Sequence, residues 1–378
     1  MIKNVLITGG AGFIGSNIAL KLIQKGYIVT VLDNLSKQIH GENPKKDSPL
    51  YNSIKGKVKF ILGSVTSKKD WREALKDQDA IIHLAAETGT GQSMYEIKRY
   101  CDINIGGTAL LFDILTNYKH TIKKIIVASS RAIYGEGKYL SLKYGFVYPE
   151  SRNSDDMTNG FFEPTYFDDK ELKLCATDED SKIHPTSVYG ISKQVQEQLV
   201  LTMCKSIGIS AIAYRYQNVY GPGQSLTNPY TGILSIFSSR ILKGQPINIF
   251  EDGKESRDFV YIDDVVEATI AGLENETITG EVFNVGTGIS TSVMEVVESL
   301  MENYNKKVDY ALSGNFRIGD IRHNYADITK IKVKLGFKPY INFKEGIKNF
   351  THWVQQQPLI DNNYEKSIDE MKQKGLFK

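Results

Sequence analysis

A tyrosine and a lysine four residues apart, Tyr189 and Lys193 in SVYGISK, form a pair that could transfer protons. On a helix, positions i and i+4 share a face, so the lysine ammonium would lie beside the phenol. A free tyrosine has a pKa of about 10, and a nearby positive charge stabilises its phenolate. Lowering the tyrosine pKa by about 3 corresponds to roughly 4 kcal/mol of differential interaction between the phenol and the phenolate. Because this spacing is also common on exposed helix faces, the role of Tyr189 as a base depends on its neighbours.

The segment VASSRAIYG supplies one such neighbour at the end of an apolar run over residues 124–130. Active sites of doubly wound sheets gather at the carboxyl ends of the strands. Ser130 could therefore hydrogen-bond a substrate oxygen and orient it towards Tyr189. A strand-ending turn is the alternative explanation for Ser129 and Ser130.

A second candidate site lies at the N-terminus, where ITGGAGFIGSNIA holds Gly9, Gly12 and Gly15 between an expected strand and helix. These glycines permit a tight turn, close approach of a pyrophosphate to the helix N-terminus, and close helix–strand packing. Asp33 ends the next strand about 20 residues later, where a carboxylate accepts both ribose hydroxyls. A 2′-phosphate would meet like charge there, so the pattern favours NAD over NADP, although Lys37 lies nearby in sequence. Chance glycines in a turn are the alternative.

Short apolar runs alternate with helical patterns through the first part of the chain. They predict strands over 4–8, 28–33, 58–62, 80–86, 124–130 and 210–216, and helices over 14–25, 70–76, 93–117 and 187–206. Such alternation is typical of a parallel sheet that helices cover on both faces. We therefore expect an α/β fold, a Rossmann-type doubly wound parallel sheet with a smaller C-terminal α/β substrate lobe.

The predicted domains follow this change of pattern. We expect an NAD-binding domain over 1–215, a substrate lobe over 216–358 that is interleaved with it, and a C-terminal tail over 359–378 that is either a helix or frayed. Residues 137–184 form an aromatic, acidic and non-periodic insertion in the first domain. It is long for a loop in a compact domain, so we expect it to be functional, mobile or a surface addition.

The composition excludes several classes of protein. The 378 residues include 46 basic and 44 acidic side chains, for a net charge of +2, which argues against nucleic acid as a partner. Cys101, Cys175 and Cys204 are too far apart in sequence for a disulfide framework or a metal site. No apolar run approaches the roughly 20 residues that span a bilayer, and the N-terminus has no signal-peptide pattern. We expect a cytoplasmic protein without a metal or a membrane partner.

Eight segments resemble, in order, those of the extended short-chain dehydrogenase/reductase family and its nucleotide-sugar epimerase branch. They are TGGAGFIG, HLAA, NIGGT, SSxxxYG, YxxxK, RYQNVYGPGQ, RDFVYIDD and FNVGTG, which together cover nearly the whole chain. The resemblance implies bound NAD, a nucleotide-sugar substrate and a homodimer formed by the helices over 93–117 and 187–206. Burial of the apolar stripes of these helices against the sheet is the alternative to a dimer.

The resemblance also implies roles by position: Tyr189 as the base, Lys193 on the nicotinamide ribose and Ser130 as the substrate anchor. With the glycine motif, the expected cofactor-binding residues are Gly9, Gly12, Phe13, Ile14, Asp33, Asn34, Ser64, Val65, Leu84, Ala85, Ala86, Thr88, Asn104, Ser129, Tyr189, Lys193, Tyr216 and Asn218. The expected substrate-binding residues are Thr88, Gln92, Ser130, Arg131, Asn218, Arg257, Arg317 and Asp320. A guanidinium pairs with phosphate oxygens, and a carboxylate accepts ribose hydroxyls.

Three features of the sequence leave questions open. In ETGTGQ, which follows a predicted strand, we expect Thr88 and Gln92, together with Ser93, to face cofactor or sugar, whereas Glu87 either does the same or caps a helix. Ser64 replaces the usual family aspartate near adenine. Gln217 replaces a usual phenylalanine, and a polar residue there could contact the substrate.

The residues after Ser130 discriminate between reactions. Related dehydratases and decarboxylases carry carboxylates there, whereas this chain reads Arg131-Ala132-Ile133-Tyr134, so an elimination would lack its base. This favours C4 epimerisation through a 4-keto sugar, and further segments are similar to those of epimerases that act on dTDP-6-deoxyhexoses. A dehydrogenase or reductase, a dehydratase and a non-enzymatic NAD-sensing regulator are the alternatives. Such regulators typically lose the tyrosine or lysine, and both residues are present here.

Overall fold

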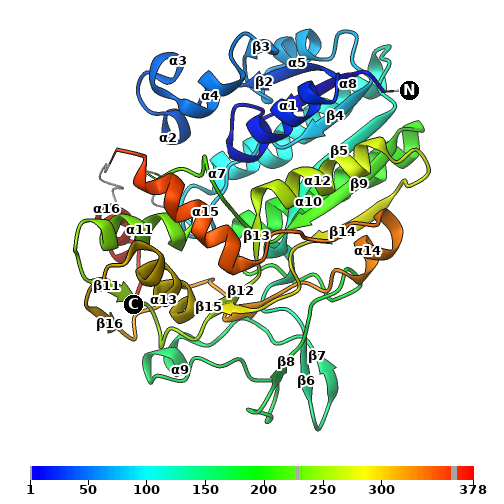
Figure 1. Ribbon diagram of the computed structural model, residues 1–378. Helices are drawn as coiled ribbons and strands as arrows, with labels where there is room; N and C mark the ends of the chain where they lie inside the picture. The colour runs from blue at the N-terminus through cyan, green and yellow to red at the C-terminus, as the bar shows by residue number, and fades with distance from the viewer. Residues whose placement is uncertain (1, 227, 229, 231, 359–363) are drawn as a thin grey trace.

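The protein is built around a seven-stranded parallel sheet. The computed structural model describes residues 2–226, 228, 230, 232–358 and 364–378 (Figure 1). The strand order is β14-β9-β5-β4-β1-β2-β3. The strands are β1 (Asn4–Thr8), β2 (Ile28–Asp33), β3 (Lys59–Leu62), β4 (Ala80–His83), β5 (Lys124–Ser130), β9 (Ser210–Tyr216) and β14 (Glu281–Val285). The order reverses direction between β1 and β4, and doubly wound sheets bind ligands at such a switch point. The predicted Rossmann-type fold is confirmed.

Helices cover both faces of this sheet. On one face lie α1 (Phe13–Gln24) and α12 (Ile262–Glu274), and on the other lie α5 (Lys68–Ala74), α8 (Gly107–Asn117) and α10 (Val188–Ile207). Side chains of a strand alternate between the two cores, so Val5 and Ile7 pack beneath α1 while Leu6 packs on the opposite side. Burial on both faces explains why the strands read as continuous apolar runs.

The single helix predicted over 93–117 is broken in the structure. The segment forms α6 (Thr90–Ser93), α7 (Ile97–Tyr100), a π-helical stretch η1 (Cys101–Gly106) and then α8. A π turn inserts a residue into the helical repeat and rotates the side chains that follow it. Gly107 lies against Val65, whose Cγ2 atom is 2.7 Å from the place of a Cβ on that glycine. The apolar spacing of α8 gave no sign of the irregularity, because the π stretch precedes it.

The C-terminal half is divided between the sheet and a smaller lobe. Although β14 and α12 fall within the range predicted for the lobe, β14 pairs with β9 and α12 packs against α1, so both belong to the Rossmann layer. The lobe contains α11 (Ile233–Leu242), β11 (Ile247–Ile249), α13 (Val293–Tyr304), β16 (Tyr310–Leu312) and α15 (Phe343–Gln355). Its short strands β12 (Ser256–Arg257), β15 (Thr291–Ser292) and β17 (His323–Asn324) pair with one another. The lobe lies below the sheet in Figure 1.

The C-terminal tail contains a packed helix, the first of the two alternatives predicted for it. Helix α16 (Tyr364–Gln373) buries Ile368 and Met371, and residues 359–363 lie outside the described residues. Beyond it, Phe377 packs against Phe250 with ring centroids 5.0 Å apart. The end of the chain is therefore part of the smaller lobe.

The insertion over 137–184 has its own secondary structure. It forms β6 (Tyr139–Ser141), β7 (Gly145–Val147), β8 (Lys173–Leu174) and the short helix α9 (Ser154–Thr158). The three strands make an antiparallel sheet at the far end of the molecule from α1 (Figure 1). Within the described part of the chain, no helix has the length and apolar character needed to cross a membrane.

Candidate active site

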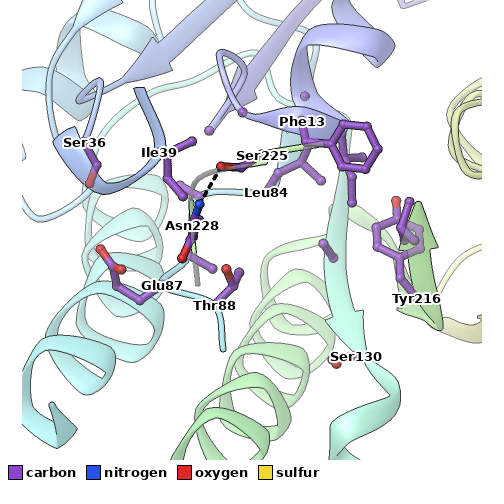
Figure 2. A pocket seen from close by; sticks show the side chains of 18 of the residues that line it. Phe13, Ser36, Ile39, Leu84, Glu87, Thr88, Ser130, Tyr216, Ser225 and Asn228 are labelled. Atoms are coloured by element: carbon purple, nitrogen blue, oxygen red, sulfur yellow. Dashed lines mark hydrogen bonds between the residues drawn. The ribbon is translucent and has the colours of Figure 1, made fainter. Parts of the chain in front are cut away.

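A cavity of about 440 Å³ opens at the carboxyl ends of the central strands, between the sheet and the smaller lobe (Figure 2). Most of the predicted site residues line it: Gly9, Gly12, Phe13, Ile14, Asp33, Asn34, Ser64, Val65, Leu84, Ala85, Ala86, Thr88, Ser129, Ser130, Arg131, Tyr189, Lys193, Tyr216 and Asn218. The structure places five others outside its wall: Gln92, Asn104, Arg257, Arg317 and Asp320.

The nucleotide end of the cavity has the features that a dinucleotide requires. Gly9 has a φ of +68°, and a Cβ on it would lie 2.9 Å from the backbone nitrogen of Ala85. Helix α1 begins after Gly12 without a side-chain cap, so its first amides are open to an anionic group. The carboxylate of Asp33 is fixed by the backbone N–H groups of Ala11 and Leu35, at 3.0 and 2.8 Å. These residues fit the pyrophosphate and ribose of NAD.

The surroundings of Asp33 favour NAD over NADP. Lys37, the basic residue nearest in sequence, pairs with Glu42 at 2.7 Å and is exposed to solvent. His40 lies closer, with its Nε2 atom 3.9 Å from Asp33, but burial lowers the pKa of His40 despite the opposing effect of that carboxylate. A 2′-phosphate would therefore meet a carboxylate and no guanidinium or ammonium from these neighbours.

Tyr189 is held at the start of α10 by backbone contacts. Ser187 caps the helix, and the Tyr189 N–H donates to the hydroxyl of Ser93 at 3.0 Å. Burial raises the pKa of the phenol, while the Ser130 hydroxyl and the Arg131 guanidinium act in the opposite direction. Tyr189, Ser130 and Arg131 all line the cavity. Further positive charge from a bound cofactor would favour the phenolate.

Lys193 begins a chain of buried hydrogen bonds. Its ammonium donates to the Gln196 side-chain oxygen, and the Gln196 amide donates to Thr108 at 2.9 Å. His83 contacts Thr108 through Nε2 at 3.0 Å and Thr8 through Nδ1 at 2.7 Å. Burial and the nearby ammonium lower the pKa of His83 to about 3, so its ring is neutral. The neutral network fixes the lysine without neutralising its charge.

Replacing Lys193 with methionine should stabilise the ligand-free protein while lowering turnover about 100-fold. Burial lowers the pKa of Lys193 to about 7, with Glu197 opposing, whereas an unfolded lysine titrates near 10.4. The unfolded state thus binds more protons between these values, and stability rises with pH across that window. The gain from Lys193→Met should be largest below pH 7, about 2 kcal/mol, and should shrink towards pH 10. Thermal unfolding at several pH values measures it.

The exposed Lys205, on the same helix, supplies the control. Lys205→Met should leave both turnover and the pH dependence of unfolding unchanged. A Lys193→Met protein that is less stable than the wild type at pH 6 would contradict the cost assigned to the buried ammonium.

Asn104 was expected to line the cofactor, and the structure places it one layer behind. Its Oδ1 accepts from the Glu87 N–H at 2.8 Å, and its Nδ2 donates to the Glu87 carbonyl at 3.1 Å and to Ser192 at 2.8 Å. It lies in the π-helical stretch, which turns the side chain towards this loop. Asn104 therefore fixes the loop of Glu87 and Thr88 against α10.

The ETGTGQ loop contributes less directly than predicted. Thr88 lines the cavity, and its carbonyl accepts from the Tyr100 hydroxyl at 2.7 Å. Gln92 is buried outside the cavity wall and exchanges hydrogen bonds with Gln38 at 3.0 and 3.3 Å. Ser93, expected to offer a bond to the sugar, instead receives the Tyr189 N–H. Glu87 lines the cavity, and its carboxylate pairs with Arg99 at 2.7 Å. It does not cap the following helix, whose N-cap is Gly89.

The three residues predicted to grip the nucleotide form a cluster next to the cavity. Arg257 pairs with Asp320 at 2.9 Å, and the Arg317 guanidinium lies 4.9 Å from the centre of the Phe250 ring. Burial favours protonation of Asp320, but four guanidiniums together lower its pKa, those of Arg257, Arg317, Arg131 and Arg152. Arg131 reaches from this cluster to the cavity wall, where its Nε donates to Asn218 at 2.9 Å. The cluster thus places four guanidiniums around one carboxylate.

Sequence reasoning missed the wall between β2 and β3. This segment forms three short helices, α2 (Lys37–His40), α3 (Pro44–Asp47) and α4 (Pro49–Ile54). The cavity is lined by Gln38, Ile39 and His40 of α2, by its N-cap Ser36 and by Leu50 of α4. The pair Ser48–Pro49 was an available signal, because serine at the N-cap and proline at the first position mark a helix start. Gln217 and Gln224 also line the cavity.

The fold and cavity are those of a Rossmann-type dinucleotide-binding protein. Residues 5–152 and 165–286 match the model of the NAD dependent epimerase/dehydratase family. The chain belongs to that family. The interruption of the match falls within the insertion.

The chain is similar to nucleotide-sugar epimerases along most of its length. It is 36% identical to the dTDP-L-rhamnose 4-epimerase of Burkholderia thailandensis, over 94% of this chain and 96% of that protein. The UDP-glucose 4-epimerase of Thermotoga maritima, solved with UDP-glucose, has a TM-score of 0.75 and 32% identity, covering 93% and 99% of the two chains. The UDP-glucuronic acid 4-epimerase of Bacillus cereus, solved with UDP-glucuronic acid and NAD, gives a TM-score of 0.74 and 26% identity at the same coverage.

Proposed function

We propose that the protein is an NAD-dependent nucleotide-sugar 4-epimerase that acts on a dTDP-6-deoxyhexose. The observation that carries the proposal is that Tyr189, Lys193 and Ser130 line the same cavity as the open N-terminus of α1. The candidate proton-transfer group and the candidate dinucleotide site thus share one cavity. The similarity to dTDP-L-rhamnose 4-epimerase supports the choice of sugar class.

The chain's own residues supply the proton chemistry. When bound, NAD provides a site that accepts hydride from C4 and returns it to the opposite face of the 4-keto sugar. Tyr189 removes the proton of the C4 hydroxyl and later returns it, and Ser130 holds the sugar oxygen beside the phenol. The Lys193 ammonium stabilises the phenolate and would contact the nicotinamide ribose. The reaction is redox-neutral because the hydride and the proton both return to the sugar.

Cavity chemistry disfavours the related reactions. Elimination requires a carboxylate near C5 and C6 of the sugar, but Ser130 is followed by Arg131 and Ala132. Among the described residues, the carboxylates in the cavity wall are Asp33, at the nucleotide end, and Glu87, which Arg99 holds. A dehydrogenase would release NADH at every turnover. A regulator would not require the Tyr189–Lys193 pair, which this chain retains.

We propose that Arg257, Arg317 and Asp320 bind the nucleotide diphosphate and its ribose, with Arg131 at the sugar end. The charge of this cluster supports the assignment, because guanidinium forks match phosphate oxygens. In the same scheme, residues 1–215 bind NAD and 216–358 contribute the nucleotide-sugar lobe, with α12 and β14 returning to the sheet.

We also propose a homodimer formed through α8 and α10, working in the cytoplasm. Leu111, Ile114 and Leu115 are buried within the subunit, so the apolar stripe of α8 is largely used by the sheet. The face of α10 with the exposed Ile191 and the half-buried Leu199 would supply the contact. The interface would thus use mainly α10, with a smaller contribution from α8 than the sequence predicts.

Ligand analysis and a substrate screen test the proposed function. Mass spectrometry of the purified protein should detect NAD, and assays with dTDP-, UDP- and GDP-sugars should produce C4 epimers. Absorbance at 340 nm should show no net NADH. Steady NADH accumulation with an oxidised sugar product would overturn the epimerase in favour of a dehydrogenase.

A further inference from the structure

The side chain of Gln217 is buried and has no partner within the described structure. It is 5% exposed and lines the cavity, and neither its Oε1 nor its Nε2 makes a hydrogen bond to a described residue. Leaving a buried polar atom unpaired costs about 1–3 kcal/mol. A buried amide with both ends unpaired in a cavity wall is therefore expected to find its partner in a ligand.

The backbone and neighbours of Gln217 fix the place of its amide. Its N–H donates to the Val285 carbonyl at 3.0 Å, extending the β9–β14 ladder. A Cβ on Gly286 would lie 2.7 Å from the Cγ of Gln217, so the glycine makes room for this side chain. This close approach restricts where the Gln217 side chain can lie.

A neighbouring carboxylate, that of Asp258, is unavailable as a partner. Asp258 lies beside Gly286, but its Oδ1 accepts from the backbone and hydroxyl of Thr287 at 2.8 and 2.7 Å. Its Oδ2 accepts from Gly288 at 2.9 Å and Ala326 at 3.2 Å. This carboxylate already receives four hydrogen bonds, so the amide is left to the cavity.

A second unpaired group lies at the neighbouring strand end. The Ser129 hydroxyl is buried, lines the cavity and has no hydrogen bond within the described structure. Ser129 pairs with Arg215 across β5 and β9, and Gln217 follows Arg215 by two residues. Ser130 pairs with Tyr216 between them. The two unpaired groups therefore flank the strand ends at which the reaction is proposed to occur.

We propose that the Gln217 amide binds a neutral ligand group that both donates and accepts hydrogen bonds, and that this pairing sets ligand specificity at the reactive end. The inference rests on the proposed function and deepens it. A phosphate or carboxylate would satisfy Nε2 but would place negative charge against Oε1, so an anionic group does not match. Two groups of a nucleotide-sugar epimerase complex have the required chemistry: the carboxamide of the nicotinamide and a hydroxyl of the sugar.

Calorimetric titrations of a Gln217→Leu variant distinguish the two sources. Leucine keeps a similar bulk and removes both hydrogen-bonding atoms. NAD is titrated into the ligand-free protein, and dTDP-L-rhamnose into the NAD-loaded protein. We expect affinity to fall about 10-fold or more in the first titration if the carboxamide is the partner, and in the second if it is a sugar hydroxyl. The ligand-free variant should also be at least as stable as the wild type, because it loses an unpaired amide.

Gln78→Leu is the matched control. Gln78 is another buried glutamine with an unpaired Oε1, but it lies outside the cavity wall beside Thr30. Its substitution should leave both affinities unchanged. If Gln217→Leu does not fold, Gln217→Glu keeps the size, removes the donor and adds a charge, and it should weaken the same titration.

The result that overturns the inference is a Gln217 variant whose affinities for both probes stay within two-fold of the wild type. Failure of the proposed function looks different. A wild-type protein that binds NAD but converts no nucleotide sugar to its C4 epimer refutes the epimerase, while the NAD titration still decides whether Gln217 binds the cofactor.

Discussion

A Tyr189→Phe protein should fold, bind NAD and lose about 1,000-fold or more of its epimerase turnover. The substitution removes the phenolic oxygen that is proposed to act as the base and leaves the aromatic ring in its place. A 1,000-fold loss corresponds to about 4 kcal/mol of transition-state stabilisation, within the range of general acid–base catalysis. Turnover is measured by NMR detection of C4 epimers, and bound NAD is measured in the same samples to separate chemistry from cofactor binding.

Tyr100→Phe is the control for this prediction. The Tyr100 ring lies edge-on to that of Tyr189, with centroids 6.4 Å apart, and its hydroxyl donates to the Thr88 carbonyl. The same loss of a phenolic oxygen at this site should reduce turnover less than 10-fold, because Tyr100 lies outside the cavity wall. Substantial turnover in Tyr189→Phe would remove this tyrosine from the role of base.

The same assignment predicts the sign of the pH dependence. Burial raises the pKa of Tyr189 in the ligand-free protein, while Ser130 and Arg131 oppose the shift. A base must be deprotonated to act, so kcat/KM should rise with pH until the phenol of the loaded enzyme ionises. Removing the Lys193 ammonium should move that rising limb to higher pH, because the phenolate loses its nearest cation on the helix.

Local patterns were sufficient to predict six of the seven strands of the sheet, but they assigned β14 to the smaller lobe. The apolar runs identified β1, β2, β5 and β9 within a residue of their bounds, because strands buried on both faces leave a continuous signal. The spacing of Gly9, Gly12 and Gly15 and of Tyr189 and Lys193 depends on one turn and one helix. These residues were therefore placed by rules that act over short distances along the chain, and their roles stay predictions.

Contacts between distant parts of the chain could not be read in the same way. Asn104 lies in the π-helical stretch and Gln92 in the short helix α6, and both lie outside the cavity wall. Neither of these irregular elements produces a periodic apolar pattern in the sequence, so neither could be predicted. The role of the insertion depends on ion pairs between residues far apart in sequence: Arg152 with Glu251, 99 residues away, and Glu163 with Arg322, 159 residues away. No periodicity encodes such pairs.

Arg322→Met should destabilise the protein by about 3–5 kcal/mol. Arg322 is 0% exposed, and its guanidinium binds Glu163 at 2.6 Å, Asp252 at 2.7 Å and Glu251 at 2.9 Å. Removing the buried cation breaks its pair with the buried Glu251 and takes a counter-charge from the more exposed Asp252 and Glu163, and breaking a buried ion pair by removing one partner is costly. Denaturant unfolding followed by tryptophan fluorescence and by circular dichroism measures the loss of stability.

Lys254→Met tests whether burial of Arg322 is the reason for the expected loss of stability. Lys254 lies 3.8 Å from the same carboxylate, Asp252, but its side chain is 75% exposed. An exposed pair contributes at most about 1 kcal/mol, so this variant should unfold almost as the wild type does. Equal effects of the two substitutions would contradict the assignment of the network as a buried support.

The network also connects the insertion to the residues proposed to bind the nucleotide. Arg152, from the insertion, contacts Glu136 at 3.1 Å, Glu251 at 2.8 Å and the Asp320 carbonyl at 3.1 Å, and Asp320 pairs with Arg257. Folded Arg322→Met protein should therefore bind its nucleotide sugar more weakly, with KM raised more than kcat is lowered, because Tyr189 and Ser130 lie on the separate Rossmann layer. Equal KM values in variant and wild type would indicate that the insertion contributes only to the stability of the protein. A raised KM would indicate that it also supports substrate binding by the smaller lobe.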